Sequence, residues 1–379
     1  MDNTNTILTK NSEFKFQHLY PQIEIYKPDI TQKFMQLLDK MFDSFKKEVN
    51  GVLVEQININ ELKKFFTEFD QSLNNIKDSK FQRDVETMNT SISLGLKIKN
   101  GTVIIHILLD SSEKYANYIP VLVHALNTIC NTFSCDYDGL VIYICLDNNK
   151  RNIEYYPKIT DDYGKIFHHL HKTSQAFNVS GVTQRLNKNI VLTKNEEIVK
   201  LMFHELVHFI GLDNELSKNS DDIMKYSEAY TEFMSIILNS AYESIHLYRL
   251  VANSNLYDIY KRLLNIEINY SLYLSSNIIK FFGYGQNNFV TFFEKNNNSP
   301  ISVKEYVILR SQLFLNSNSL TEILNLSDSW AVDTNNKNGI IKLMEIDDNL
   351  VNILSMFIEK TVPIKNLSYT MVDFAWNKF

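Results

Sequence analysis

The segment from 196 to 210 constrains the chain more than any other, because it places two histidines and a glutamate inside an almost continuous apolar run. Its apolar residues lie all round a helical wheel and are Ile198, Val199, Leu201, Met202, Phe203, Leu206, Val207 and Ile210. A helix that is apolar nearly all round is buried. His204, Glu205 and His208 would then lose contact with water, which is costly unless they are paired or coordinated. We therefore expect a buried helix that carries a polar site.

Both ends of this predicted helix carry recognisable signals. Thr193 and Glu196 have the spacing of a capping box, which predicts a helix start just before the motif. Gly211 follows the last turn and is typical of a C-terminal cap. A short strand pattern from 189 to 193 leads directly into the helix. The sequence therefore predicts a strand followed at once by a helix with defined ends.

The spacing of His204, Glu205 and His208 is that of an H-E-x-x-H motif. On a helix, positions i and i+4 lie on one face about one turn apart, so both imidazoles can bind one tetrahedral metal ion. Glu205 then lies beside the metal, where it can take a proton from the zinc-bound water. A catalytic zinc ion needs a third protein ligand and keeps its fourth position for water. The oxygen donors that compete for the third place are Asp213, Asn214, Glu215, Glu228 and Glu232.

The region from about 180 to 235 resembles the gluzincins, the thermolysin-like zinc peptidases. In that clan, H-E-x-x-H is completed by a glutamate on a following helix. Here Glu228 lies 20 positions after His208 and opens the amphipathic stretch SEAYTEFMSIIL. The resemblance implies one zinc ion, bound by His204, His208 and Glu228.

The resemblance further implies roles for neighbouring residues. Glu205 would be the general base in hydrolysis of a peptide bond, and Glu232, four residues after the ligand glutamate, would bind the imidazole of the first histidine. An edge strand of the family's sheet binds the substrate backbone, and either 189–193 or 179–183 would be that strand here. The residue before the ligand glutamate is Ser227, which departs from the Asn that thermolysin has there.

The motif does not identify the group that would stabilise the oxyanion. Tyr284 is one candidate, because some aminopeptidase-type gluzincins place a catalytic tyrosine far downstream of the ligand glutamate; the alternative is an ordinary loop tyrosine. The cluster of His168, His169 and His171 is another candidate, with a second metal site or plain polar surface as the alternatives. Arg310 would either bind a substrate carboxylate or form an ordinary surface ion pair.

Gly211 also fits the longer metzincin pattern, H-E-x-x-H-x-x-G. The next ligand position of that pattern falls on Asn214, and an amide is a poor zinc ligand compared with histidine or a carboxylate. We therefore interpret Gly211 as a helix cap and favour the gluzincin arrangement.

The whole chain predicts a helix-rich α+β fold with a small mixed sheet packed on the active-site helix and a helical C-terminal region. We divide it into a supporting region over 1–88, a zincin-like catalytic core over 89–255, and a helical region over 256–379. Two strands, LGLKIK and TVIIHILL, flank Asn100-Gly101, a strong hairpin signal. The other elements expected before the motif are helices over 29–49, 60–76 and 112–133 and a buried strand over 140–147.

Composition restricts the partners and the setting. The formal charge is −6 over 379 residues, which argues against nucleic-acid or anionic-membrane partners. No uncharged apolar run approaches the roughly 18 residues of a membrane span, and the N-terminus does not look like a secretory signal. Cys130, Cys135 and Cys145 are best interpreted as reduced thiols. We therefore predict an intracellular protein, or a virion component if a virus encodes it.

The predicted partner is a peptide or protein substrate, and two other functions compete with a peptidase of restricted specificity. One is a virion or scaffold protein whose zinc site is only structural. The other is a metal-dependent effector or toxin that acts on one host protein. Nothing in the sequence fixes the oligomeric state or the cleavage preference.

Overall fold

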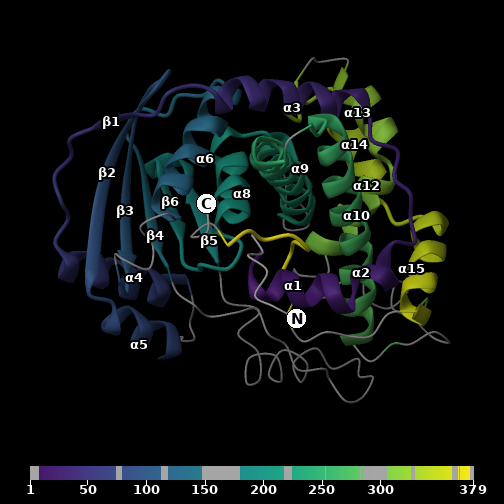
Figure 1. Cartoon of the computed structure of the whole chain (residues 1–379), viewed down its shortest axis with the longest axis horizontal. Coiled ribbons are helices and arrows are strands. Elements are labelled where there is room, and N and C mark those ends of the chain that lie inside the picture. Colours follow the sequence, from purple (N-terminus) through teal and green to yellow (C-terminus); the bar gives the residue numbers. More distant parts are fainter. Residues whose placement is uncertain are drawn as a thin grey trace.

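The computed structural model of the chain combines one mixed sheet with many helices. In Figure 1 the sheet stands on the left, the long helix α9 runs through the centre, and further helices fill the right half. The predicted α+β, helix-rich class is confirmed. The structure describes residues 8–73, 79–111, 118–146, 180–216, 224–251, 253–281, 284, 290, 305–325, 329–360, 366 and 368–375.

Within the described residues, six strands form the sheet in the order β1-β2-β3-β4-β6-β5. The two central pairs, β3 with β4 and β4 with β6, are parallel. The remaining pairs are antiparallel, so β5 is an antiparallel edge strand. The strands are β1 (Asn50–Val52), β2 (Thr90–Ile98), β3 (Gly101–Leu109), β4 (Leu140–Cys145), β5 (Gly181–Gln184) and β6 (Asn189–Leu192).

The predicted hairpin is confirmed, with its turn one residue earlier than the signal suggested. Ile98 pairs with Gly101, so Lys99 and Asn100 form the turn and the glycine is already in β3. A Cβ on Gly101 would lie 2.4 Å from the backbone nitrogen of Asp138. The glycine is therefore required by the close approach of the loop before β4.

Alternate residues of the strands point to opposite faces of the sheet, and each face has its own core. Ile107 and Ile190 belong to the large core, together with residues of α6 and α8. Leu108 and Val191 belong to a smaller core with residues of α4 and α5. The sheet therefore lies between two pairs of helices, which are α4 (Ile59–Leu73), α5 (Ser79–Thr87), α6 (Tyr118–Thr132) and α8 (Ile198–Ile210).

The remaining helices pack behind α6 and α8, on the side away from the sheet (Figure 1). The large core includes residues from all three regions that the sequence suggested, and the division into those regions stays a prediction. Among the described residues, none of the helices is both long and apolar enough to cross a membrane. These further helical elements are α1 (Lys10–His18), α2 (Tyr20–Ile23), α3 (Gln32–Phe45), α9 (Met224–Leu250), α10 (Leu256–Phe281), the π-helical turn η3 (Glu305–Leu309), α12 (Arg310–Leu315), α13 (Ser317–Asn325), α14 (Lys337–Met344) and α15 (Asp348–Lys360).

The buried helix α8 is confirmed, and its C-terminal cap is Gly211, with a φ of +85°. The predicted capping box at its start is wrong. The helix begins at Ile198 after Glu197, which has a left-handed backbone and forms no side-chain cap. Glu196 instead accepts a hydrogen bond from the Asn366 side chain. Glu197 accepts from the backbone N–H groups of the C-terminal segment 368–375. Partners about 170 residues away have replaced the local cap.

Candidate metal centre

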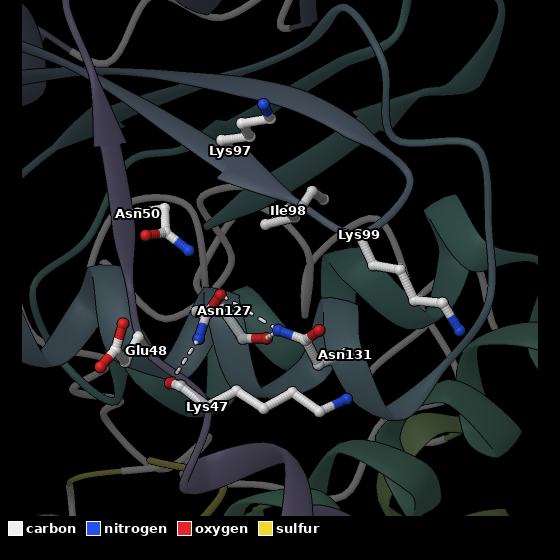
Figure 2. Close-up of a pocket in the computed structure, with 8 residues that line it drawn as sticks. All are labelled: Lys47, Glu48, Asn50, Lys97, Ile98, Lys99, Asn127 and Asn131. Carbon is white, nitrogen blue, oxygen red and sulfur yellow. Dashed lines mark hydrogen bonds between the residues drawn. The ribbon is translucent and has the colours of Figure 1, made fainter.

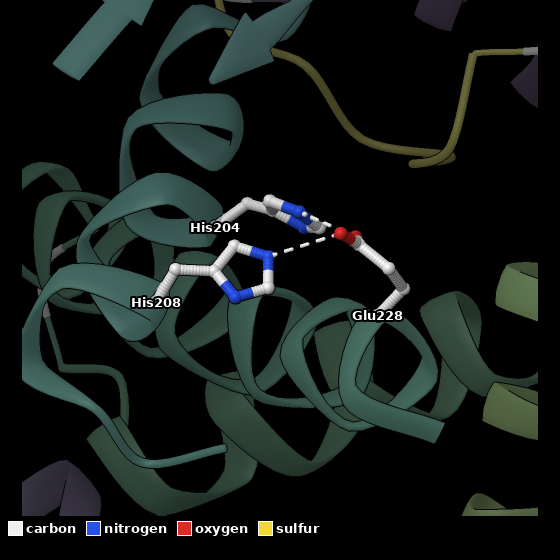
Figure 3. Close-up of side chains that lie close together, drawn as sticks. All are labelled: His204, His208 and Glu228. Carbon is white, nitrogen blue, oxygen red and sulfur yellow. Dashed lines mark ion pairs between the residues drawn. The ribbon is translucent and has the colours of Figure 1, made fainter. Parts of the chain in front are cut away.

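Helices α8 and α9 bring His204, His208 and Glu228 together. The two imidazoles project from successive turns of α8, and Glu228 points at them from the first turns of α9 (Figure 3). The Nε2 atom of His204 lies 3.2 Å from Oε2 of Glu228, and the Nε2 atom of His208 lies 3.4 Å from Oε1. Each residue thus offers one ligand atom, and these atoms lie within 4.8 Å of one another.

These distances are close to those between two ligands of one metal ion, and each imidazole faces a different oxygen of Glu228. Ligand atoms at the usual 2.0–2.1 Å from zinc and at tetrahedral angles are about 3.3 Å apart. The two nitrogen–oxygen separations of 3.2 and 3.4 Å lie on either side of that value. Two imidazoles and one carboxylate are also a donor set that suits zinc. The three side chains therefore fit the ligand set that the sequence resemblance implied.

The second nitrogen of each imidazole faces a carboxylate. Nδ1 of His204 lies 3.0 Å from Oε1 of Glu232, and Nδ1 of His208 lies 2.8 Å from Oδ2 of Asp213. Asp213 in turn accepts a short hydrogen bond from the Ser227 hydroxyl. The Asp213 contact is a hydrogen bond and can fix the His208 ring with Nε2 toward Glu228, whereas the His204–Glu232 contact is an ion pair without hydrogen-bond geometry. Glu232 thus lies where the resemblance put it, whereas Asp213, a rival third ligand, supports a histidine instead.

Glu232 is also held by two buried cations. The Lys200 ammonium lies 2.6 and 2.5 Å from its two oxygens, and the Arg310 guanidinium lies 3.2 Å from Oε2. Arg310 has no exposed surface. The predicted ion pair at Arg310 is confirmed, but the predicted surface position is wrong, because Arg310 and Glu232 are both buried.

Glu205 is buried beside the cluster and held by the edge strand β5. The Thr183 hydroxyl donates a hydrogen bond of 2.7 Å to Oε2 of Glu205. Burial disfavours the charged form and raises the pKa of Glu205 above its ordinary value of 4.5, although the two histidines and the hydroxyl act in the opposite direction. Glu205 therefore lies beside the candidate metal ligands, and its role as a general base stays a prediction.

The histidines and their carboxylates stabilise one another's charged forms. Burial alone would lower the pKa of His204 and His208, but Glu232 and Asp213 respectively, with Glu228, outweigh it and raise both pKa values. Burial likewise opposes ionisation of Glu228, but the histidines hold its pKa far below the ordinary 4.5. The cluster therefore keeps Glu228 anionic through the two imidazoles that face it.

Metal binding requires neutral imidazoles, so the charge that a metal ion would meet is counted without the imidazole protons. The four carboxylates of the cluster and the two cations on Glu232 leave a charge of −2 when both histidines are neutral. A divalent cation would neutralise that charge. The carboxylates are those of Glu205, Asp213, Glu228 and Glu232, and the cations are those of Lys200 and Arg310.

The other candidates from the sequence lie in different places. Asn214 and Glu215 begin a short 3₁₀ turn after Gly211, and among the described histidines and acidic residues Glu215 does not belong to the group of converging ligand atoms. Tyr284 is buried just beyond the end of α10, where its backbone N–H donates to the Ile279 carbonyl, and its catalytic role stays a prediction. The histidines His168, His169 and His171 lie outside the described residues.

A separate hollow of about 540 Å³ lies at the opposite edge of the sheet (Figure 2). The amide of Asn127 donates to the Lys47 carbonyl, and the amide of Asn131 donates back to Asn127. The hollow contains none of the candidate metal ligands. Its lining residues are Lys47, Glu48, Asn50, Lys97, Ile98, Lys99, Asn127 and Asn131.

Two supporting residues were not predicted from the sequence, Lys200 and Thr183. Lys200 carried a signal, because it lies four positions before His204 on the same face of a buried helix and needs a buried anion. Thr183 carried none, because its contact with Glu205 depends on where β5 packs against α8.

Comparison with known proteins gives one informative match. No family model and no solved structure matches the chain. A relative from Acanthamoeba polyphaga mimivirus, described as "Uncharacterized protein R210", is 41% identical over 363 residues, which cover 92% of each chain. The chain therefore belongs to the same family as this mimivirus protein.

Proposed function

We propose that the chain is a zinc-dependent peptidase of the gluzincin type. The observation that carries the proposal is the convergence of His204 Nε2, His208 Nε2 and the Glu228 carboxylate, with Glu205 buried beside them. The fold supports it, because a small mixed sheet packs on the helix that holds both histidines, as a zincin-like core would require.

When bound, a zinc ion would polarise the scissile carbonyl and lower the pKa of a water molecule to about 7. Glu205 would accept the proton of the attacking water and pass it to the leaving amine. Glu232 and Asp213 would hold the two imidazoles in the orientation in which Nε2 faces the metal. Each proton transfer is thus assigned to a residue that the cluster already contains.

A catalytic role is favoured over a structural zinc site by the number of ligands. Structural zinc sites have four protein ligands, whereas catalytic sites have three and an open position. Among the described residues, three side chains converge on one point. A structural role would also leave the buried Glu205 without a purpose, although burying it is costly.

A peptide substrate is supported by the position of β5. Among the described residues this strand ends the sheet, and it carries the hydroxyl that donates to Glu205. An extended peptide that paired with its outer edge would lie next to the general base. The mimivirus relative supports a viral setting, in which the enzyme would act in the host cell or the virion on a restricted set of proteins.

Metal analysis of the purified protein tests this proposal most directly. Wild-type protein should contain one zinc ion per chain, and Glu228→Ala should lose most of it. Glu322→Ala, at an exposed position of α13, is the matched control and should keep the metal. Incubation with a peptide library from a digested cell lysate would then reveal cleavage. Protein without zinc would overturn the proposal, and zinc-loaded protein that cleaves no peptide would favour the structural role.

A further inference from the structure

The edge strand β5 touches both carboxylate oxygens of Glu205. The Thr183 hydroxyl donates to Oε2 at 2.7 Å and also lies 2.8 Å from the backbone oxygen of Glu205. A hydroxyl has one hydrogen, so these two acceptors compete for it. Because both acceptors belong to the same residue, Thr183 is tied to Glu205 in either case.

The other oxygen of Glu205 lies against Gly181. A Cβ on this glycine would come within 2.5 Å of Oε1 and within 2.9 Å of two side-chain carbons of Glu205. No real Cβ contact is so short, so any larger residue would push the carboxylate away. Gly181 therefore leaves the space that the carboxylate occupies between β5 and α8.

The alternation of the strand explains why these two residues act together. Residues 181 and 183 point to the face of the sheet that α8 covers, whereas Val182 packs against the smaller core on the opposite face. Strand β5 thus places the Thr183 hydroxyl beside Oε2 of Glu205 and the side-chain-free Gly181 beside Oε1. A free glutamate side chain would distribute itself over several rotamers.

We propose that Thr183 is a positioning residue for Glu205, the proposed general base. Gly181 leaves the space that the Glu205 carboxylate occupies. This inference rests on the proposed function, because it assigns these residues to a base that acts in hydrolysis. A base works only within hydrogen-bond reach of the proton it accepts. Thr183 would hold Glu205 in the one orientation that faces the metal ligands.

Two variants of Thr183 separate the hydroxyl from the shape of the side chain. Thr183→Val keeps the branched shape and loses the donor, whereas Thr183→Ser keeps the donor. Thr102→Val makes the same chemical change in β3, away from the cluster, and is the matched control. None of these residues belongs to the converging ligand atoms, so zinc content should stay at the wild-type value in all three variants.

Kinetics on a peptide that wild-type protein cleaves provide the first readout. Thr183→Val should lower kcat by about 10- to 100-fold and leave KM nearly unchanged, because misplacing a reacting group by about 1 Å costs a factor of that size. Thr183→Ser should recover most of the lost rate, and Thr102→Val should behave as wild type. Equal losses in Thr183→Val and Thr183→Ser would overturn the positioning role.

Crystal structures of the zinc-loaded variants provide a readout that needs no substrate. The Glu205 carboxylate should be turned away from its wild-type position in Thr183→Val and in Gly181→Ala, and should be in place in Thr183→Ser. A carboxylate that stays in place in Thr183→Val would refute the inference. If wild-type protein binds zinc but cleaves no peptide, the proposed function fails, while these structures still show whether Thr183 holds Glu205.

Discussion

The two ends of helix α8 use buried carboxylates in different ways. At the N-terminal end, Glu197 accepts hydrogen bonds from the backbone N–H groups of Tyr369 and Thr370. Nearby, Glu267 of α10 accepts from the N–H groups of the next two residues in the same segment. These carboxylates meet fixed backbone donors. Their role is to hold the C-terminal segment against the core.

At the other end of the helix, the carboxylates meet titratable partners. The oxygens of Glu228 face Nε2 atoms, and an imidazole nitrogen donates or accepts according to its protonation state. A cation between these atoms would satisfy all of them at once. Burial of an acid is therefore not by itself a sign of a site. Convergence of several ligand atoms on one point does indicate a site. Substitutions at the two ends of α8 should therefore affect different properties, metal binding at one end and stability at the other.

The largest effect is expected at Glu205. Glu205→Gln keeps the shape of the side chain but removes its ability to accept a proton, so turnover should fall by about 10²- to 10⁴-fold, the usual contribution of a general base. Zinc content should not change, because the ligand set is intact. Peptide cleavage and metal analysis on the same preparation would measure both. Wild-type turnover in this variant would contradict the assignment, and Glu322→Gln is the control for the chemical change.

A smaller effect, on zinc affinity, is expected from substitution of Glu232 or Asp213, the carboxylates that face Nδ1 of the two histidines. Glu232→Gln and Asp213→Asn should each weaken zinc binding by about 10- to 100-fold, as loss of a group that orients a ligand usually does. Glu232→Gln should also lower the free energy of unfolding by about 3–5 kcal/mol, because Lys200 and Arg310 would be left buried without their anion. In Asp213→Asn the imidazole of His208 can release its proton, whereas Lys200 and Arg310 keep their anion, so its unfolding free energy should change less.

Zinc competition with a chelator and denaturant unfolding of the metal-free protein separate these two quantities. If both variants bound zinc as wild type does, the two carboxylates would have no part in the metal site. If Asp213→Asn destabilised the protein as much as Glu232→Gln does, the buried cations Lys200 and Arg310 would not account for the destabilisation of Glu232→Gln.

Sequence patterns predicted what depends on neighbours along the chain. The apolar run of α8, its Gly211 cap and the hairpin at Ile98–Gly101 all follow from residues within a few positions. The H-E-x-x-H spacing likewise places both imidazoles on one helical face. These features need no knowledge of the tertiary structure, which is why they were predicted correctly.

What the sequence could not decide depends on packing between distant segments. Asp213 and Glu228 were both plausible third ligands, and only the placement of α9 shows which one faces Nε2 and which faces Nδ1. The capping box at Glu196 failed for the same reason, because Glu196 and Glu197 have their partners at Asn366 and Tyr369, near the end of the chain. Local propensity was overridden by contacts across about 170 residues.

The smallest effect is expected at the N-terminal end of α8, where pH should act on stability alone. Burial raises the pKa of Glu267 to about 7, although the N–H groups of Val372 and Met371 and the charge of Lys15 oppose the shift. The folded protein therefore holds a proton that the unfolded chain releases near pH 4.5. The stability due to this proton is complete below about pH 4.5 and is lost as the pH rises through 7.

Glu267→Gln stays neutral at every pH and keeps an acceptor oxygen for the two N–H groups. Between pH 5 and 8, metal-free wild-type protein should lose about 2–3 kcal/mol more unfolding free energy than this variant, at 1.4 kcal/mol per pKa unit. Denaturant unfolding across that range measures the difference, and the histidines cancel because both proteins contain them. Zinc affinity should be equal in the two proteins. Parallel stability curves would mean that Glu267 does not keep its proton up to about pH 7 in the folded protein. A change in zinc affinity would mean that a carboxylate of the structural end influences the metal centre.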